Sequence, residues 1–235
     1  MFVFNNKKGF TLLELVVAMA ISTIVMAAIY STYQAQLRSH ITQQALVEMQ
    51  QNARAAMFAM EREIRMGGYD PSEDADAKIL IADAAQIKFQ IDRNEDGNPA
   101  PVPGTDPNEQ IRFALTANGD LGREVWGPPE GAGSLQTVAE NIEVLEFIYL
   151  DETGAVVATP LDYAIVADRD KLASIRSIQI TLIAKSGANV PVLMMKHKDH
   201  RTYTNQQGDQ LLVNPDDNFR RIVLTADVQC RNLGI

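Results

Sequence analysis

A lone carboxylate, Glu14, lies near the start of the most apolar stretch of the chain. From Phe10 to Tyr30 most residues are Leu, Ile, Val, Met, Ala or Phe, and Glu14 is the one charged side chain among them. A charge inside a membrane helix costs about 2.5–3.5 kcal/mol on insertion scales. A carboxylate in such a place needs a partner of opposite charge or a function. The chemistry that it can perform there is the neutralisation of a positive charge.

A second group of oxygen-bearing side chains occurs at Asp92, Asn94 and Asp96, with a glycine at the next position. Alternate oxygen ligands before such a glycine are typical of the first half of a calcium loop. The position where an EF-hand has its bidentate Glu is Pro103, so the second half does not fit. Two interpretations stay open: a calcium site completed by a downstream oxygen, or an Asx-rich surface turn between strands.

No other cluster in the sequence points to catalysis. His197 and His200 stand beside Asp199, but no cysteine cluster or His-Glu-x-x-His helix could complete a zinc site. A solvated basic patch is the simpler interpretation. The chain also lacks a Gly-rich phosphate loop and a nucleophile elbow, so we do not expect an enzyme.

The element that must position Glu14 is the apolar run itself. Residues 10–30 match the ~20 residues that a helix needs to cross a bilayer. Lys7 and Lys8 come just before the run and no basic residue lies within it. Because cytoplasmic segments retain positive charge, we expect residues 1–9 inside the cell and the rest of the chain outside it.

The segment Lys7-Lys8-Gly9-Phe10-Thr11-Leu12-Leu13-Glu14-Leu15 resembles the processing site of type IV prepilins and type II secretion pseudopilins. This resemblance implies that a dedicated membrane peptidase, prepilin peptidase, cuts between Gly9 and Phe10 from the cytoplasmic side. The same resemblance implies methylation of the new amino terminus at Phe10, and it makes Glu14 the fifth residue of the mature chain.

Cleavage at this position would change the charges at the start of the helix. Cleavage after Gly9 would remove both lysines and leave a cationic amine on Phe10. In a low-dielectric setting, Glu14 of a neighbouring chain could neutralise that amine. Such a pairing would set the stagger between adjacent helices in an assembly.

Two ordinary explanations of the apolar run remain. A secretory signal peptide would be cut after it, with Ala18-Met19-Ala20 or a later small-residue site as the boundary. Its apolar region is normally ~7–15 residues, which is shorter than the run found here. A plain signal anchor has the right length but does not account for Gly9, Phe10 and Glu14 together.

The helix is predicted to continue to Met66, because no Gly or Pro occurs between Phe10 and that residue. Gly67-Gly68 and then Asp70-Pro71 predict its end. Pilins of the resembled family often carry a proline where this chain has Ser31, which leaves a kink there open. Seven apolar residues draw one stripe along the second half of the helix: Leu46, Met49, Ala53, Ala56, Met57, Met60 and Ile64. This stripe could cover a sheet of the same chain or form a coiled-coil seam with another subunit, and we favour the sheet.

Beyond Pro71 the periodicity changes to alternation, which predicts antiparallel strands. The predicted strands cover residues 87–91, 111–115, 144–150, 178–182 and 222–230. Three stretches rich in turn residues are predicted to be loops: 93–109, 127–136 and 185–218. The fold class is therefore α+β, with a long amino-terminal helix packed on an antiparallel sheet, as in pilins.

Composition limits the remaining possibilities. After the helix, about 170 of the 235 residues remain, enough for one globular unit. The formal charge of −9 would become more negative on loss of Lys7 and Lys8, so nucleic-acid binding is not expected. A single cysteine, Cys230, cannot form an internal disulfide, so packing alone must stabilise the exported part.

A wider resemblance extends beyond the amino terminus. The end of the helix from Ala53 to Tyr69, the loop at 92–97 and the last strand from Arg220 to Asn232 are similar to PilW-type minor pilins. The J-type minor pseudopilin of type II secretion has a similar layout and stays an alternative. The K-type pseudopilin lacks the membrane glutamate, so Glu14 argues against it.

These resemblances imply an organisation and a function. We expect a leader peptide at 1–9, a transmembrane half-helix at 10–30, an exported half-helix at 31–66 and a globular antiparallel-sheet domain at 67–235. The expected protein is a minor pilin in the inner membrane, with a cytoplasmic amino terminus and a periplasmic domain. It would pass into an extracellular type IV pilus and help to initiate or cap its assembly. Its partners would be prepilin peptidase, other major and minor pilins, and membrane lipid. A tip adhesin with a calcium-stabilised loop is the alternative from another functional class.

Overall fold

The computed structural model describes residues 9–99, 109–126, 134–187 and 198–233. The chain divides into two units, residues 1–44 and residues 45–235. One helix, α1 (Leu12–Ile64), contributes to both units, and its 53 residues agree with the predicted 10–66 helix. The two units are treated separately below.

The first unit consists of the amino-terminal part of α1. The helix continues through Ser31 without a break, so the kink that was left open at this position is absent from the helix. Hydroxyl groups in this region donate to carbonyl oxygens one turn earlier: Thr23 to Met19 at 2.8 Å, and Ser31 and Thr32 to Ala28 at 2.9 and 3.0 Å. Each hydroxyl is thereby satisfied inside its own helix, as an apolar environment requires.

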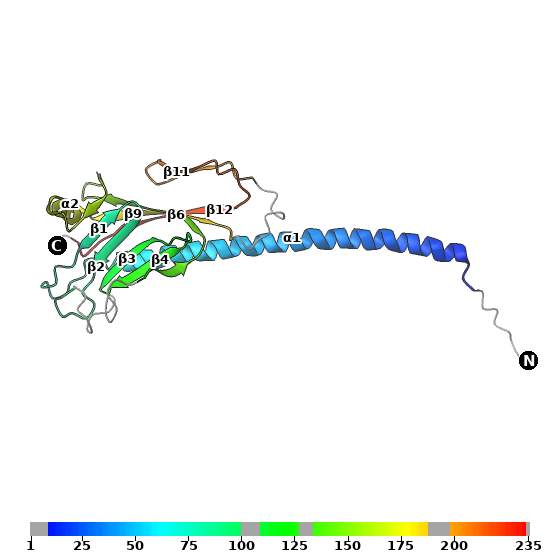
Figure 1. The fold of residues 1–235 in the computed structure, drawn as a ribbon, viewed down its shortest axis with the longest axis horizontal. Helices are drawn as coiled ribbons and strands as arrows, with labels where there is room; N and C mark the ends of the chain where they lie inside the picture. Colours follow the sequence, from blue (N-terminus) through cyan, green and yellow to red (C-terminus); the bar gives the residue numbers. More distant parts are fainter. Residues whose placement is uncertain (1–8, 100–108, 127–133, 188–197, 234–235) are drawn as a thin grey trace, which may run out of the picture. The chain divides into compact units, whose positions relative to one another are not determined.

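The second unit contains two antiparallel sheets and a hairpin (Figure 1). The larger sheet has six strands in the order β5-β4-β3-β2-β1-β8. Its strands are β1 (Ile79–Asp83), β2 (Gln86–Gln90), β3 (Gln110–Leu115), β4 (Leu121–Trp126), β5 (Gln136–Ala139) and β8 (Leu161–Asp162). The second sheet has four strands in the order β12-β9-β6-β7. They are β6 (Ile142–Leu150), β7 (Val156–Val157), β9 (Ser177–Lys185) and β12 (Arg221–Gln229).

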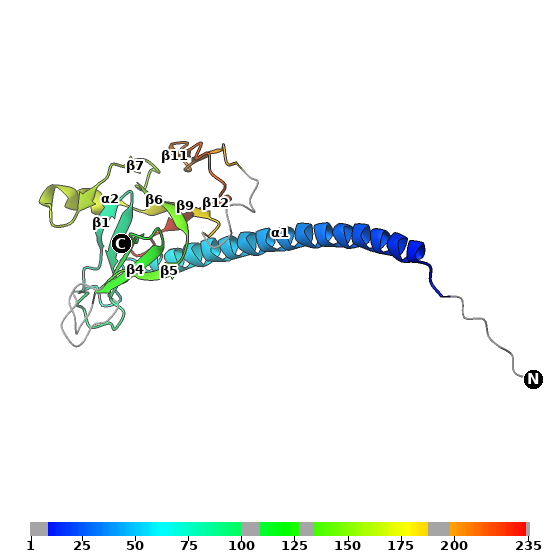
Figure 2. The ribbon, with the colours of Figure 1, turned by 45° about the vertical axis from the view of Figure 1, so that its right-hand side comes forward.

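A short helical region precedes β9, and the hairpin follows it. The helical region is a 3₁₀ turn, η1 (Val166–Asp168), continued by α2 (Arg169–Ser174). The hairpin is a separate two-stranded sheet of β10 (Thr202–Thr204) and β11 (Gln210–Val213). In both ribbon views the β11 label stands above the β12 label (Figures 1 and 2). It lies inside the stretch 185–218 that was predicted to be a loop, and that part of the prediction was wrong.

One apolar core joins the helix to both sheets. The predicted stripe residues Met49, Ala53, Ala56, Met57, Met60 and Ile64 are all buried in it, and Leu46 packs against it half-buried. The α+β class and the packing of the helix on antiparallel strands are therefore confirmed. Tyr149 of β6 links the two sheets, because its hydroxyl oxygen lies 3.1 Å from the carbonyl oxygens of both Asp83 and Gln86, which share its single hydrogen.

The helix ends where the two glycines predict. The amide of Gly67 donates to the Ile64 carbonyl at 2.9 Å, and the amide of Gly68 leaves the helix to donate to the carbonyl of Gln90 in β2. Gly68 has a φ of +77°, and a Cβ there would lie 2.4 Å from the side chain of Leu233. The left-handed backbone favours glycine at this position, and any larger residue would also have to displace the Leu233 side chain.

Candidate functional site at the amino terminus

The amino terminus of α1 is built by Thr11 and Glu14. The Thr11 amide and hydroxyl both donate to Oε2 of Glu14 at 3.0 Å, and the Glu14 amide donates to Oγ1 of Thr11 at 3.2 Å. This reciprocal arrangement is a capping box, in which the side chains three residues apart satisfy amide groups of the first helical turn. The predicted charged group Glu14 therefore sits in the first turn of the helix, held by Thr11.

The apolar side chains around this cap are largely exposed in the described structure. Phe10, Leu12 and Leu13 are 89, 81 and 74% exposed, and large apolar side chains stay exposed along the helix as far as Tyr33. By length and composition, α1 could cross a membrane. An exposed apolar surface of this length requires an apolar environment, either lipid or the matching surface of other chains.

This geometry supports charge neutralisation at the start of an apolar rod. Gly9 and Phe10 precede the cap and lie outside the helix, where the backbone is not committed to helical hydrogen bonds. Lys7 and Lys8 lie outside the described residues. Sequence reasoning named Glu14 but missed Thr11, although the Thr-x-x-Glu spacing before an apolar run was a sufficient signal.

Comparison with known proteins bears on this segment. Residues 4–30 match the family model described as the prokaryotic N-terminal methylation motif. The amino terminus is prepilin-like. The matched residues contain Gly9, Phe10 and Glu14 and end with the apolar run at Tyr30. The match does not extend into the globular unit.

Among solved structures, a type IV-like pilin from Thermus thermophilus has 13% sequence identity to this chain and a TM-score of 0.48. The alignment covers 79% of this chain and 97% of that one. No match to this sequence is found among the curated proteins.

The Asp92 loop follows β2 and is closed by its own hydrogen bonds. The buried Asp92 carboxylate accepts the Glu95 amide at 2.8 Å and the Gly97 amide at 3.1 Å. The side-chain oxygen of Asn94 accepts the amide of Asp96 at 3.0 Å. A side-chain oxygen of Asp96 accepts the amide of Asn98 at 2.9 Å. Asn94 and Asp96 thus each form an Asx turn, while Asp92 accepts amides three and five residues further along the loop.

Glu109 is the downstream carboxylate that reaches this loop. Its Oε1 accepts the amides of Arg93 and Asn94 at 3.1 and 3.3 Å. The structure therefore brings Asp92, Asn94 and Glu109 together. Within the parts of the chain that the structure describes, however, no three His, Cys, Asp or Glu side chains are grouped as metal ligands. The calcium site stays a prediction.

Asp199 belongs to an ion-pair cluster around Arg221, not to a solvated patch. Burial alone would raise the pKa of the Asp199 carboxyl, but hydrogen bonds from Tyr203, Arg201 and Arg221 lower this pKa to about 2. The guanidinium of Arg221 also pairs bidentately with Glu143, at 2.5 and 3.0 Å, and with Asp217. The cluster ties the base of the hairpin to β6 and β12, and His197 lies outside the described residues.

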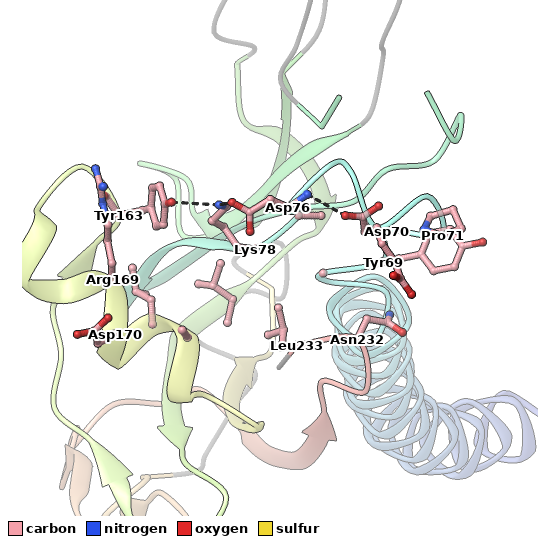
Figure 3. Close-up of a pocket in the computed structure, with 16 residues that line it drawn as sticks. Tyr69, Asp70, Pro71, Asp76, Lys78, Tyr163, Arg169, Asp170, Asn232 and Leu233 are labelled. Carbon is pink, nitrogen blue, oxygen red and sulfur yellow. Dashed lines mark hydrogen bonds and ion pairs between the residues drawn. The ribbon is translucent and has the colours of Figure 1, made fainter. Parts of the chain in front are cut away.

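A cleft of about 860 Å³ opens beside the end of α1 (Figure 3). The ring of Tyr163 lies between Lys78, whose Nζ is 4.4 Å from the ring centroid, and Arg169, whose Cζ is 4.7 Å away. Lys78 also donates to the Tyr163 hydroxyl and pairs with Asp76. Both cations are thus engaged by their own neighbours, and the arrangement selects no particular ligand.

Proposed function

We propose that this chain is a minor pilin that helps to initiate or cap a type IV pilus. In this proposal, prepilin peptidase cuts the membrane-anchored precursor between Gly9 and Phe10, and Phe10 is then methylated. The observation that carries the proposal is the match of residues 4–30 to the methylation motif, at the start of a helix whose apolar side chains are exposed. A structural role, not an enzymatic one, follows from it.

The helix would serve first as an anchor and then as an assembly element. In the precursor, residues 10–30 would lie in the inner membrane with the amino terminus in the cytoplasm and the globular unit in the periplasm. In the filament, the same apolar surface would pack against the helices of other pilins. Lipid contacts would be exchanged for protein contacts, so the exposed side chains would stay out of water in both states.

Glu14 would guide this exchange. Cleavage creates an amine on Phe10, and the capping box holds the Glu14 carboxylate in the first helical turn. A neighbouring chain's amine could then reach a carboxylate in a fixed position. In an apolar surrounding, two opposite charges attract much more strongly than in water, and either charge left unpaired is costly. The pairing would therefore fix the axial position of each new subunit.

Mass spectrometry of the mature protein tests the processing step. We expect a product that begins with N-methylated Phe10 and lacks residues 1–9. A Gly9→Val variant, which places a branched side chain at the cut, should stay full length in the membrane. A product that begins after Ala20, or any other site in the apolar run, would instead identify a secretory signal peptide.

A further inference from the structure

Among the strands that the structure describes, β12 has the longest edge with no neighbouring strand. The larger sheet ends in β5, with four residues, and β8, with two, while the second sheet ends in β7, with two residues, and in β12, with nine. Long edges invite pairing with other chains, and proteins usually protect them with bulges, prolines or short length. Three of these four edges are short. β12 is not.

The pairing pattern shows which backbone groups of β12 face outward. Nine consecutive residues pair with β9 without a register shift. Just beyond the two ends of this ladder, the amide of Ser186 donates to the carbonyl of Arg220, and the amide of Cys230 donates to that of Arg176. The backbone amides and carbonyls of the even-numbered β12 residues therefore point toward β9. By the alternation of an antiparallel ladder, the odd-numbered residues direct their amides and carbonyls away from the sheet.

Side chains along this edge are also incompletely covered. On the face toward the core, Ile222, Leu224 and Ala226 pack against the cluster but stay half-buried. On the opposite face, Thr225 and Asp227 are exposed. Among the described residues, Asp227 has no ion-pair partner. An added strand would need apolar side chains on one face and neutral or basic ones on the other.

We propose that the edge of β12 receives an extended segment of a different polypeptide, which continues the four-stranded sheet. The segment would alternate apolar residues, covering Ile222, Leu224 and Ala226, with polar residues, one of them a Lys or Arg near Asp227. Backbone hydrogen bonds to Val223, Thr225 and Asp227 supply affinity in this type of recognition, and the alternating side chains supply specificity. The choice of a different polypeptide as partner rests on the membrane anchoring in the proposed function, but not on the pilus itself.

A second copy of this chain is a poorer occupant. Antiparallel pairing of two β12 strands requires a two-fold axis perpendicular to the sheet. In both ribbon views the stretch of α1 within the globular unit and β12 run in broadly the same direction (Figures 1 and 2). The two-fold axis would therefore reverse the direction of this helical stretch. The helical stretches of the two globular units would then run antiparallel, which disfavours this pairing between chains that approach from the same side.

Amide hydrogen exchange on the unmodified chain tests the proposal directly. In purified chain in detergent, the amides of Val223, Thr225 and Asp227 should exchange fast, while those of Leu224 and Ala226, paired with β9, should be protected. In native membranes or sheared filaments, we expect the three odd amides to slow by roughly 100-fold, because pairing replaces their contact with water. Equal exchange of these amides in the purified and assembled states would overturn the proposal.

A proline variant provides the second test. Thr225→Pro removes an amide that faces outward, so the ladder to β9 keeps its hydrogen bonds. We expect this variant to keep its far-ultraviolet spectrum and to be retained in the assembly at least tenfold less than the wild type. The matched Thr225→Ala variant keeps the amide and should be retained within twofold. Normal retention of folded Thr225→Pro would contradict the proposal, and a detergent dimer lost in this variant would replace it with self-pairing.

If Thr225→Pro does not fold, the exchange measurement decides alone. Measuring the exchange separately in membranes and in filaments keeps the two proposals distinct. Absence of the chain from filaments would count against the pilin assignment, while protection of the odd amides in membranes would still support strand addition.

Discussion

At the scale of single residues, substitutions can separate the effect of the Glu14 charge from the effect of the Thr11 cap. Glu14→Gln keeps a side chain that can still accept the Thr11 amide but removes the charge, so insertion and cleavage should be normal while incorporation into filaments falls tenfold or more. Thr11→Val removes the hydroxyl of the cap and should cost the helix about 0.5–2 kcal/mol, with incorporation within twofold of wild type. Counting the chain in sheared filaments measures both. Equal incorporation of Glu14→Gln and wild type would contradict the proposed pairing.

Asp199 predicts a pH dependence of stability. Its pKa is lowered from 3.8 to about 2 in the folded chain, so it stabilises the fold above pH 4 and this contribution is lost as the pH falls through 2. The difference corresponds to about 2 kcal/mol. In urea unfolding at pH 6, Asp199→Asn should therefore have a lower free energy of unfolding than wild type. The difference between the two free energies should narrow between pH 4 and pH 2. A gap that does not change with pH would show that the carboxylate is not responsible.

At the scale of elements, the exported half of α1 offers a matched pair of positions. Met60 is fully buried, whereas Phe58, two residues earlier on the opposite face, is 67% exposed. Met60→Ala should lower the free energy of unfolding by about 2–5 kcal/mol, because it leaves a cavity between the helix and the sheets. Phe58→Ala should change it by no more than about 0.5 kcal/mol. Similar losses at both positions would mean that the outer face of the helix is covered by something else.

The Asp92 loop can be tested by calcium titration. Because the oxygens of Asp92, Asn94 and Asp96 already accept amides of their own loop, we expect the Asx-turn interpretation to hold. The melting temperature of metal-free chain should then be unchanged by millimolar calcium. A rise that disappears in Asp92→Asn would establish the calcium site instead, with Glu109 as the downstream ligand to examine next.

Elements with a strong period were predictable, and those fixed by distant contacts were not. In the stripe from Met49 to Ile64 and in the alternation of β2, β3, β6, β9 and β12, the spacing of apolar residues follows the buried face of the element. This spacing can be read from the sequence alone. β10 and β11 are only three and four residues long, and their place depends on the pairing of Asp199 and Asp217 with Arg221, which no local pattern reveals. Charge predicted the position of Glu14, and the Thr-x-x-Glu spacing also indicates the capping role of Thr11, which the hydrogen bonds of the first turn then show.

At the scale of the whole molecule, the chain combines an apolar rod that needs an apolar surrounding with an acidic globular unit that needs none. The rod carries the motif match and the proposed assembly function. The globular unit carries the features that differ most from a bare anchor: two sheets, an open β12 edge and the hairpin. Any recognition of targets would therefore be expected in the globular unit, and the hairpin is its most separable part.

Removing the hairpin distinguishes an assembly role from target binding. Thr202 and Val213 are paired across its base, so residues 202–213 can be replaced by a two-residue Asn-Gly turn. The deletion removes Tyr203 but keeps Asp199, Asp217 and Arg221, so the base of the cluster should still form. We expect a lower melting temperature, because the deletion removes the hydrogen bonds of Tyr203 to Asp199, Asn205 to Glu146 and Gln206 to the Ala226 carbonyl. We expect incorporation into filaments within twofold of wild type. Loss of incorporation in a folded deletion variant would mean that the hairpin holds neighbouring pilins, since a segment that only contacts targets is dispensable for assembly.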